Sequence, residues 1–258
     1  GENDQTQGDE RTTPDPGDVD NYDVLLKLQK FNNSGQIGLV AQKYRATSDL
    51  HLFSSENARY GDYYSADTLT RYRLKSPLFD ALHWQIDWQQ TETINDSSMV
   101  YNGYNRLINR DFDQTTWQLK TDFSKQIDVG IPQQLAYGLT LKRDDYESLS
   151  EDYNLDADTV EQSRFSPPGT ATRVGLYLQD RLSLAEDRGS LTPALRFDHY
   201  EYDLDNDNLT SQSYDGAEGQ ALTGQIGGTW NIASSTELFG KTGFGFRAPS
   251  YEELYYDY

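Results

Sequence analysis

A strict alternation of apolar and polar side chains over residues 82–89 is the feature that most constrains the fold of this chain. In the segment LHWQIDWQ, Leu, Trp, Ile and Trp occupy the even positions, and polar residues occupy the odd positions. Successive side chains of a β-strand point to opposite sides of a sheet, whereas a helix repeats about every 3.6 residues. The segment is therefore predicted to be a β-strand with an apolar phase on one side and an aqueous phase on the other.

The same alternation returns in about ten segments, and the connections between them alternate between short and long. The expected strands are 22–31, 36–42, 68–75, 82–92, 112–123, 135–141, 173–184, 191–202, 222–232 and 237–247. Long connections are expected at 46–67, 93–111, 143–170 and 203–219, and a polar loop at 1–20. A strand of about ten residues, tilted by about 45°, rises roughly 23 Å, close to the apolar height of an outer membrane. The pattern predicts an all-β fold, an antiparallel transmembrane β-barrel segment with short periplasmic turns and long extracellular loops.

The composition narrows the class of protein further. Only 35% of the residues are hydrophobic but 13% are aromatic, which favours many thin apolar faces over one thick core. A soluble β-propeller or β-sandwich is the competing fold, but its strands tend to be shorter and its loops need not alternate in length. No run of apolar residues is long enough for a membrane-spanning helix.

Charge and residue counts exclude several functions. The net charge of -20 argues against nucleic acid as a partner. The absence of cysteine excludes disulfides, thiolate metal sites and thiol nucleophiles, and three histidines argue against a metal centre. No set of catalytic residues is apparent, so we expect a protein that is not an enzyme.

The segment from Gly243 to Tyr255, GFGFRAPSYEELY, resembles the Phe-Arg-Ala-Pro box of TonB-dependent outer-membrane receptors for heme and haemoglobin. Three other segments resemble that family in order and spacing, namely SPLF at 76–79, GLYLQD at 175–180 and LTPALRFDHY at 191–200. The resemblance covers most of residues 22–258. It implies a barrel of about 22 strands around an N-terminal plug, in the bacterial outer membrane, which imports a bound iron source with force from TonB.

On this resemblance the chain is a piece of a receptor, with residues 21–258 as a partial barrel that lacks the plug and the C-terminal strands. An open sheet of about ten strands supports the same expectation, because each unpaired backbone group at an edge in hydrocarbon costs several kcal/mol. The implied partners are the TonB complex, through the absent plug segment, heme or haemoglobin, and the lipid and lipopolysaccharide of the outer membrane. Heme is expected as a transported ligand and not as a permanent cofactor. In the heme branch a ligand histidine often follows the Phe-Arg-Ala-Pro box, beyond the position of Tyr258.

Candidate ligand-binding residues lie in the first long connection and at the end of the last strand. His51, Tyr60, Tyr63 and Tyr64 fall in the expected loop 46–67, and imidazole and phenolate both ligate heme iron. The alternation places Arg247 on the lumen face and Phe246 on the lipid face, so that the guanidinium could hold a heme propionate. The structural alternatives are a solvated loop histidine and an arginine paired with an acid of the barrel wall.

Other polar residues are expected to be structural. His83 is predicted at the periplasmic end of its strand, facing inward. His199 is predicted on the lipid-facing side of its strand, where it fits an aromatic girdle beside Tyr200 and Tyr202. The acidic stretch 144–161 is expected to be a solvated loop, with divalent cations bridging to lipopolysaccharide as the alternative.

Three alternative functions remain open. A siderophore receptor is the rival within the same superfamily. A passive porin or a ten-strand outer-membrane protein, such as an outer-membrane protease, is the rival from another class. A porin restricts its pore with an inward loop and lacks the Phe-Arg-Ala-Pro segment, and a protease needs a cluster of acids and histidines at its rim.

Overall fold

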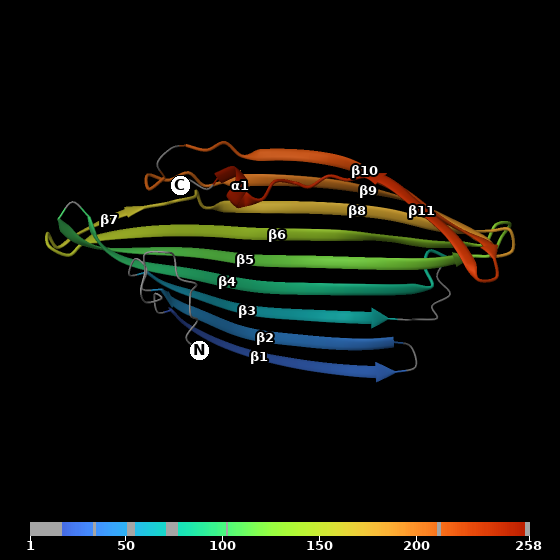
Figure 1. Cartoon of the computed structure of the whole chain (residues 1–258), viewed down its shortest axis with the longest axis horizontal. Helices are drawn as coiled ribbons and strands as arrows, with labels where there is room; N and C mark the ends of the chain where they lie inside the picture. The colour runs from blue at the N-terminus through green and yellow to red at the C-terminus, as the bar shows by residue number, and fades with distance from the viewer. Residues whose placement is uncertain are drawn as a thin grey trace, which may run out of the picture.

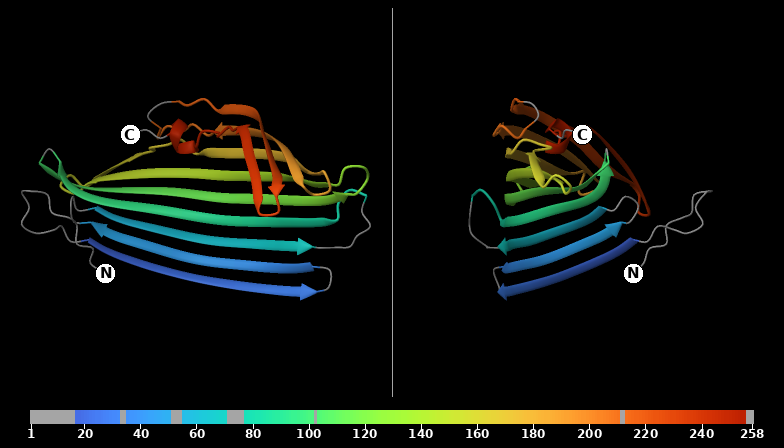
Figure 2. Two further views of the ribbon diagram at one scale, coloured as in Figure 1. Left: turned by 45° about the vertical axis from the view of Figure 1, so that its right-hand side comes forward. Right: turned by 90° about the vertical axis from the view of Figure 1, so that its left-hand side faces the viewer.

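A computed structural model describes residues 17–32, 35–50, 55–70, 77–101, 103–210 and 213–255 as one curled antiparallel sheet (Figures 1 and 2). Its elements are β1 (Gly17–Asn32), β2 (Gly35–Leu50), β3 (Ser55–Thr70), β4 (Ala81–Tyr101), β5 (Tyr104–Ile127), β6 (Gln133–Asn154), β7 (Thr159–Ser163), β8 (Gly169–Leu184), β9 (Gly189–Leu204), β10 (Ala217–Ala233), β11 (Thr236–Phe244) and the short helix α1 (Tyr251–Tyr255). Each strand pairs with the next in sequence, except that β8 pairs with β6 and β7 adds to β6 alone. Among the described residues no helix is long and apolar enough to cross a membrane.

The predicted strands are confirmed except at two places: β3 ends at Thr70, with residues 71–75 of the expected strand 68–75 outside the described residues, and β11 ends at Phe244. Three of the four predicted long connections are wrong in large part. β2 and β3 are separated only by residues 51–54, and β4 and β5 by a turn in which Gly103 adopts a φ of 81°. β6 continues to Asn154 and then pairs with β7. Strand pairing persists where both faces of a sheet meet water, whereas the alternation disappears because no apolar phase remains to select it. β1 also begins at Gly17, within the segment expected as a polar loop.

The strands β4, β5 and β6 are much longer than a membrane requires. β5 has 24 residues, which corresponds to about 80 Å at about 3.3 Å per residue. An outer-membrane apolar band is only about 25 Å tall. These strands therefore extend well beyond the membrane, and they reach past the other strands at the end of the sheet where β7 lies (Figure 1).

The outward face carries the apolar side chains and is not covered by another layer in the described part of the chain. Ile86 is 43% exposed and Trp117 is 52% exposed. Trp88 and Trp117 are register partners whose ring centroids lie 6.3 Å apart. The predicted division of side chains between an apolar and an aqueous phase is thus confirmed.

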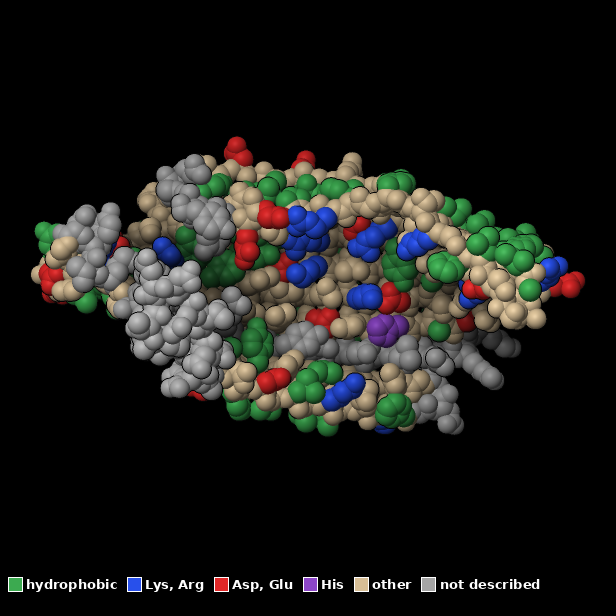
Figure 3. Space-filling view, viewed as in Figure 1, with side chains coloured by type: hydrophobic (Ala, Val, Ile, Leu, Met, Phe, Trp, Pro, Cys, Tyr) green, Lys and Arg blue, Asp and Glu red, His purple; other side chains and the backbone are tan. Residues whose placement is uncertain are grey.

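The inward face is concave and polar, and Figure 3 shows Lys, Arg, Asp and Glu side chains gathered in its hollow. Two of its tyrosines lie flat on the wall because glycines stand opposite them on the next strand. A Cβ atom on Gly138 would lie 2.5 Å from Cε1 of Tyr177, and one on Gly219 would lie 2.5 Å from the hydroxyl of Tyr200. The side chains of this face therefore pack sideways along the sheet instead of filling the lumen.

Candidate functional site

The chain after β11 turns back onto the inner face of the sheet, where α1 lies over β8 and β9 (Figures 1 and 2). We call residues 245–255 the inward segment. β11 ends at Phe244, and Pro249 has no N–H with which to continue a ladder. Ser250 and Glu253 then form a capping box, in which Glu253 N–H donates to Ser250 Oγ (3.2 Å) and Ser250 N–H donates to Glu253 Oε2 (2.7 Å). This reciprocal pair starts α1 at Tyr251.

Aromatic rings pack the inward segment against the wall, and they form the hydrophobic core of the described structure. The ring of Tyr251 stacks on that of Tyr146 with centroids 4.1 Å apart, and Tyr255 meets Tyr202 edge-on at 5.9 Å. The Tyr251 hydroxyl donates to the carbonyl of Pro167. Tyr146, Tyr202, Tyr251 and Tyr255 are all buried, and burial raises the pKa of the Tyr251 phenol. The segment is therefore docked on β6, β8 and β9.

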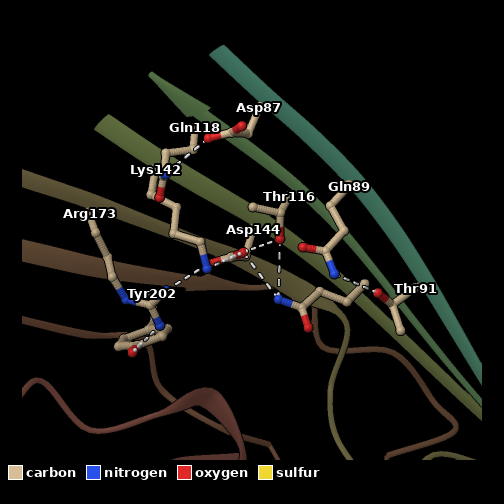
Figure 4. Close-up of polar contacts among 10 residues, drawn as sticks. Asp87, Gln89, Thr91, Thr116, Gln118, Lys142, Asp144, Arg173 and Tyr202 are labelled. Carbon is tan, nitrogen blue, oxygen red and sulfur yellow. Dashed lines mark hydrogen bonds and ion pairs between the residues drawn. The ribbon is translucent and has the colours of Figure 1, made fainter. Parts of the chain in front are cut away.

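A fully buried carboxylate, Asp144 on β6, is linked through Arg173 to Tyr202 of this aromatic cluster (Figure 4). It pairs with Lys142 Nζ at 2.9 Å and with Arg173 Nη1 at 2.6 Å. It also accepts hydrogen bonds from Thr116 Oγ1 at 2.5 Å and from Gln114 Nε2 at 3.1 Å. Four donors on one carboxylate offset the large cost of removing its charge from water.

Arg173 connects this carboxylate to the inward segment. Its Nη2 donates to the Tyr202 hydroxyl at 3.0 Å, and the guanidinium carbon lies 5.6 Å from the centre of the Tyr202 ring. The Tyr202 hydroxyl in turn donates to the carbonyl oxygen of Pro249 at 2.5 Å. A continuous set of hydrogen bonds therefore runs from β6 through β8 and β9 to the residue that precedes the α1 cap.

Arg247 pairs with an acid, as in the structural alternative, but the partner is on α1 and not on the barrel wall. Its Nη1 and Nη2 donate to Glu253 Oε2 and Oε1 at 2.9 Å and 2.7 Å. The Arg247 side chain is 73% exposed, and its hydrogen bonds lower the pKa of Glu253 to about 2. The guanidinium is accessible to a ligand that can displace or share Glu253.

The predicted parity of the last segment is wrong for Phe246, which was expected on the lipid face. Its ring stacks against Tyr200 on the inner face, with centroids 6.2 Å apart and planes 16° apart. The alternation ends with β11 at Phe244, so a parity counted beyond that residue has no strand to support it. Tyr200 and Tyr202 likewise line the inner wall, and they do not form an outward girdle with His199.

The remaining predicted site residues are not brought together by the described structure. His51 lies outside the described residues. Tyr60, Tyr63 and Tyr64 belong to β3 and not to a loop, where they are register partners of Glu92, Gln89 and Trp88. Consecutive positions of a strand belong to opposite faces, so these three positions are divided between the two faces of the sheet.

The buried residues that hold the inward segment against the wall were not predicted from the sequence. Asp144 and Tyr146 were assigned to a solvated loop because the stretch is rich in acids, whereas both are buried in β6. The Ser250-x-x-Glu253 spacing is a sequence signal for a helix start that was available. The roles of Arg173 and Tyr202 depend on contacts between distant strands, which spacing alone does not reveal.

One group of carboxylates among the described residues is close enough to hold a cation. Ligand atoms of Glu92, Asp111 and Asp113 all lie within 4.8 Å of one another. These residues share the face of Trp88 and Trp117 on β4 and β5, in the part of the strands beyond the tryptophans. They are partly exposed, as unoccupied surface acids commonly are, and they lie apart from the inward segment.

The sequence model of the TonB dependent receptor-like β-barrel family matches residues 5–258. Among solved structures, the fold is similar to the copper transporter OprC, with a TM-score of 0.74 and 15% identity over 96% of this chain and 40% of that chain. It is similar to BauA, the ferric preacinetobactin receptor from Acinetobacter baumannii, with a TM-score of 0.66 and 12% identity over 87% and 39% of the two chains. It is also similar to the ferric citrate transporter FecA in its unliganded form, with a TM-score of 0.65 and 13% identity over 89% and 36%.

A search of curated proteins finds no significant match. The chain spans about two fifths of the length of the solved structures that it matches. At these identities the structural similarity establishes the fold of the barrel wall and no ligand.

Proposed function

Because this chain belongs to the TonB-dependent receptor β-barrel family, whose members are outer-membrane transporters and not enzymes, we propose that it is part of a receptor for heme or haemoglobin-derived heme. In this proposal the whole receptor binds the iron source at its extracellular end and imports it with energy from TonB. Coupling to TonB acts through a plug segment outside the present sequence. Heme is the cargo and not a resident cofactor.

The observation that carries the heme proposal is the position of the Phe-Arg-Ala-Pro box on the inner wall. Phe246 is 45% exposed and stacks on Tyr200, so its ring offers a flat apolar surface to a planar ligand. Arg247 is the neighbouring exposed cation, and guanidinium groups bind carboxylates such as propionates in a bidentate manner. An aromatic surface beside an accessible guanidinium fits a planar dicarboxylate.

His51, Tyr60, Tyr63 and Tyr64 remain predicted as external heme contacts, and the outward apolar face is proposed to contact the lipid and lipopolysaccharide of the outer membrane. A siderophore receptor of the same superfamily is the alternative. BauA is the ferric preacinetobactin receptor and FecA the ferric citrate transporter. Family membership is the reason that a passive porin is no longer proposed.

Heme titration of the full-length receptor, followed by its Soret absorbance, tests this proposal. We expect a saturable Soret shift and capture of haemoglobin by the purified receptor. Arg247→Gln should weaken heme binding by no more than about fivefold, because an exposed ion pair with a ligand carboxylate is screened by water and contributes little. Arg143→Gln is the control, since Arg143 lies on the outward face as the register partner of Trp117. No Soret change together with saturable binding of a ferric siderophore would overturn the heme proposal in favour of the alternative.

A further inference from the structure

We propose that Asp144, Arg173 and Tyr202 form a buried relay that seats the inward segment, and that Tyr202 and Asp144 are positioning residues for ligand capture. The ligand part of this inference rests on the proposed function, whereas the seating of the segment does not. The relay runs across three neighbouring strands (Figure 4). It ends on the backbone of the Arg-Ala-Pro segment, at the carbonyl oxygen of Pro249.

The direction of the hydrogen bonds in the relay follows from donor counting. An arginine side chain donates only, so the Tyr202 hydroxyl accepts from Arg173 Nη2. A phenol has one proton, and with its acceptor role filled by Arg173 that proton points to the carbonyl oxygen of Pro249. A cation that donates to a hydroxyl polarises it and strengthens the bond that the hydroxyl donates. Tyr202 is 1% exposed, so water does not compete for this proton.

The inward segment depends on such contacts because it has left the ladder of the sheet. β11 ends at Phe244, and among the described residues the hydrogen bonds from the segment to the wall come from side chains. These are the bonds of the Tyr202 and Tyr251 hydroxyls to the carbonyls of Pro249 and Pro167. One bond fixes each side of the cap at Ser250, so the orientation of Arg247 and Phe246 depends on both.

Asp144 is the origin of the relay because its charge fixes Arg173. The carboxylate is completely buried and is held by Lys142, Thr116 and Gln114 independently of the arginine. Its remaining oxygen receives Arg173 Nη1 at 2.6 Å, which aims Nη2 of the same planar group at Tyr202. Without the charge of Asp144, the ion pair that holds Arg173 in this position is lost. The Tyr202 hydroxyl then loses the donor that orients it.

Docking of the inward segment on the wall matters for ligand binding, because a segment that has left the wall must become ordered again when the ligand binds. The apparent dissociation constant of the ligand is inversely proportional to the fraction of receptors whose inward segment is docked on the wall. Loss of one buried hydroxyl bond should increase the ratio of unseated to seated segment by about tenfold, the change expected for one such hydrogen bond. Ligand affinity falls with it only to the extent that the unseated form becomes a large fraction.

The test uses the full-length receptor in lipid vesicles, with any cysteines elsewhere replaced, since this chain has none of its own. A spin label on a cysteine at the exposed position of Glu252 reports the mobility of α1. Tyr202→Phe removes only the hydroxyl and should increase the ratio of mobile to immobile label by about tenfold. Tyr177→Phe is the matched control, because Tyr177 also lies on the inner wall and its hydroxyl donates to Asp122 Oδ1 at 2.7 Å, not to the inward segment.

Asp144→Asn provides the second arm and should mobilise the same label, provided that the barrel still shows its heat-modifiable band on an electrophoresis gel. The heme dissociation constant, measured on the same samples, should rise in Tyr202→Phe and not in Tyr177→Phe. Equal label mobility in Tyr202→Phe and the unaltered receptor would overturn the relay. A mobile label with unchanged heme affinity would overturn the role in capture. A mobile label in a receptor that binds no heme would support the relay and overturn the heme proposal instead.

Discussion

An arginine placed on the outward face should destabilise the receptor far more than one placed on the inner face, because only the outward face meets the apolar interior of the membrane. Leu176 is the central residue of the outward apolar positions of β8, and it is 48% exposed. Its register partners on the neighbouring strands are Leu139 and Phe197, so its surroundings are apolar on both sides. An arginine on the lipid face near the middle of a membrane costs about 2–4 kcal/mol. Leu176→Arg should therefore reduce the folding equilibrium constant of the full-length receptor by roughly 30- to 900-fold.

Gln179→Arg is the matched control because it places the same charge three residues away on the inner face. The register partners of Gln179 are Ala136 and Ala194, which leave room for the longer side chain. Water in the lumen solvates the guanidinium, so the substitution should cost less than about 0.5 kcal/mol, as surface substitutions usually do. The two variants thus differ in the solvent that the new charge meets and not in its chemistry.

The measurement is the free energy of unfolding in urea, with the full-length receptor inserted in lipid vesicles and tryptophan fluorescence as the signal. The two unfolding slopes should agree, so that the difference lies in the midpoint. If Gln179→Arg destabilises the receptor as much as Leu176→Arg, or more, the assignment of an apolar outer phase and an aqueous inner phase to this sheet is refuted.

Two further predictions concern packing on the inner wall and the cap of α1. Gly138→Ala should lower the free energy of unfolding by about 1–3 kcal/mol, because the new methyl group would overlap the ring of Tyr177, whereas Gly240→Ala, with no atom within 4 Å, should be nearly neutral. The pKa of Glu253 is lowered in the folded state from 4.5 to about 2, so its pairing with Arg247 stabilises the cap fully above about pH 4.5 and loses this effect as the pH falls towards 2. A spin label on α1 should gain mobility over that acidic range, and Glu253→Gln, which keeps an acceptor for the Ser250 N–H but cannot titrate, should remove this pH dependence; a pH-independent, immobile label in the unaltered receptor contradicts this role.

The alternation of side chains was sufficient to predict the strands of the membrane band. Wherever one face meets hydrocarbon, as at Ile86 and Trp88, a shift by one residue would expose the wrong side chain to the wrong phase. The apolar face and the positions of most strands were therefore predicted correctly, although β3 lies mainly N-terminal to the expected strand 68–75. Beyond the membrane both faces meet water, and residues 93–111 contain long paired strands that periodicity could not distinguish from a loop.

The candidate site was predicted only in part, for a different physical reason. The Phe-Arg-Ala-Pro box was recognised, and pairing of Arg247 with an acid was among the alternatives, but the acid is Glu253, six residues along the chain. Tyr60, Tyr63 and Tyr64 were grouped because they are close in sequence, although adjacent strand positions face opposite sides. The acidic residues around Asp144 in the sequence favoured a solvated position. In the structure it is buried, and its carboxylate meets four donors from three strands.

The alternation of side chains is enough to establish strands with one apolar and one aqueous face, because a period of two has a single structural meaning in a membrane wall. That residues 245–255 fold back onto this wall follows only from the three-dimensional arrangement of the strands. The surface on which they dock is formed by Tyr146, Arg173 and Tyr202 on three different strands. Side chains so far apart in sequence meet only when the sheet curls and brings the strands into register.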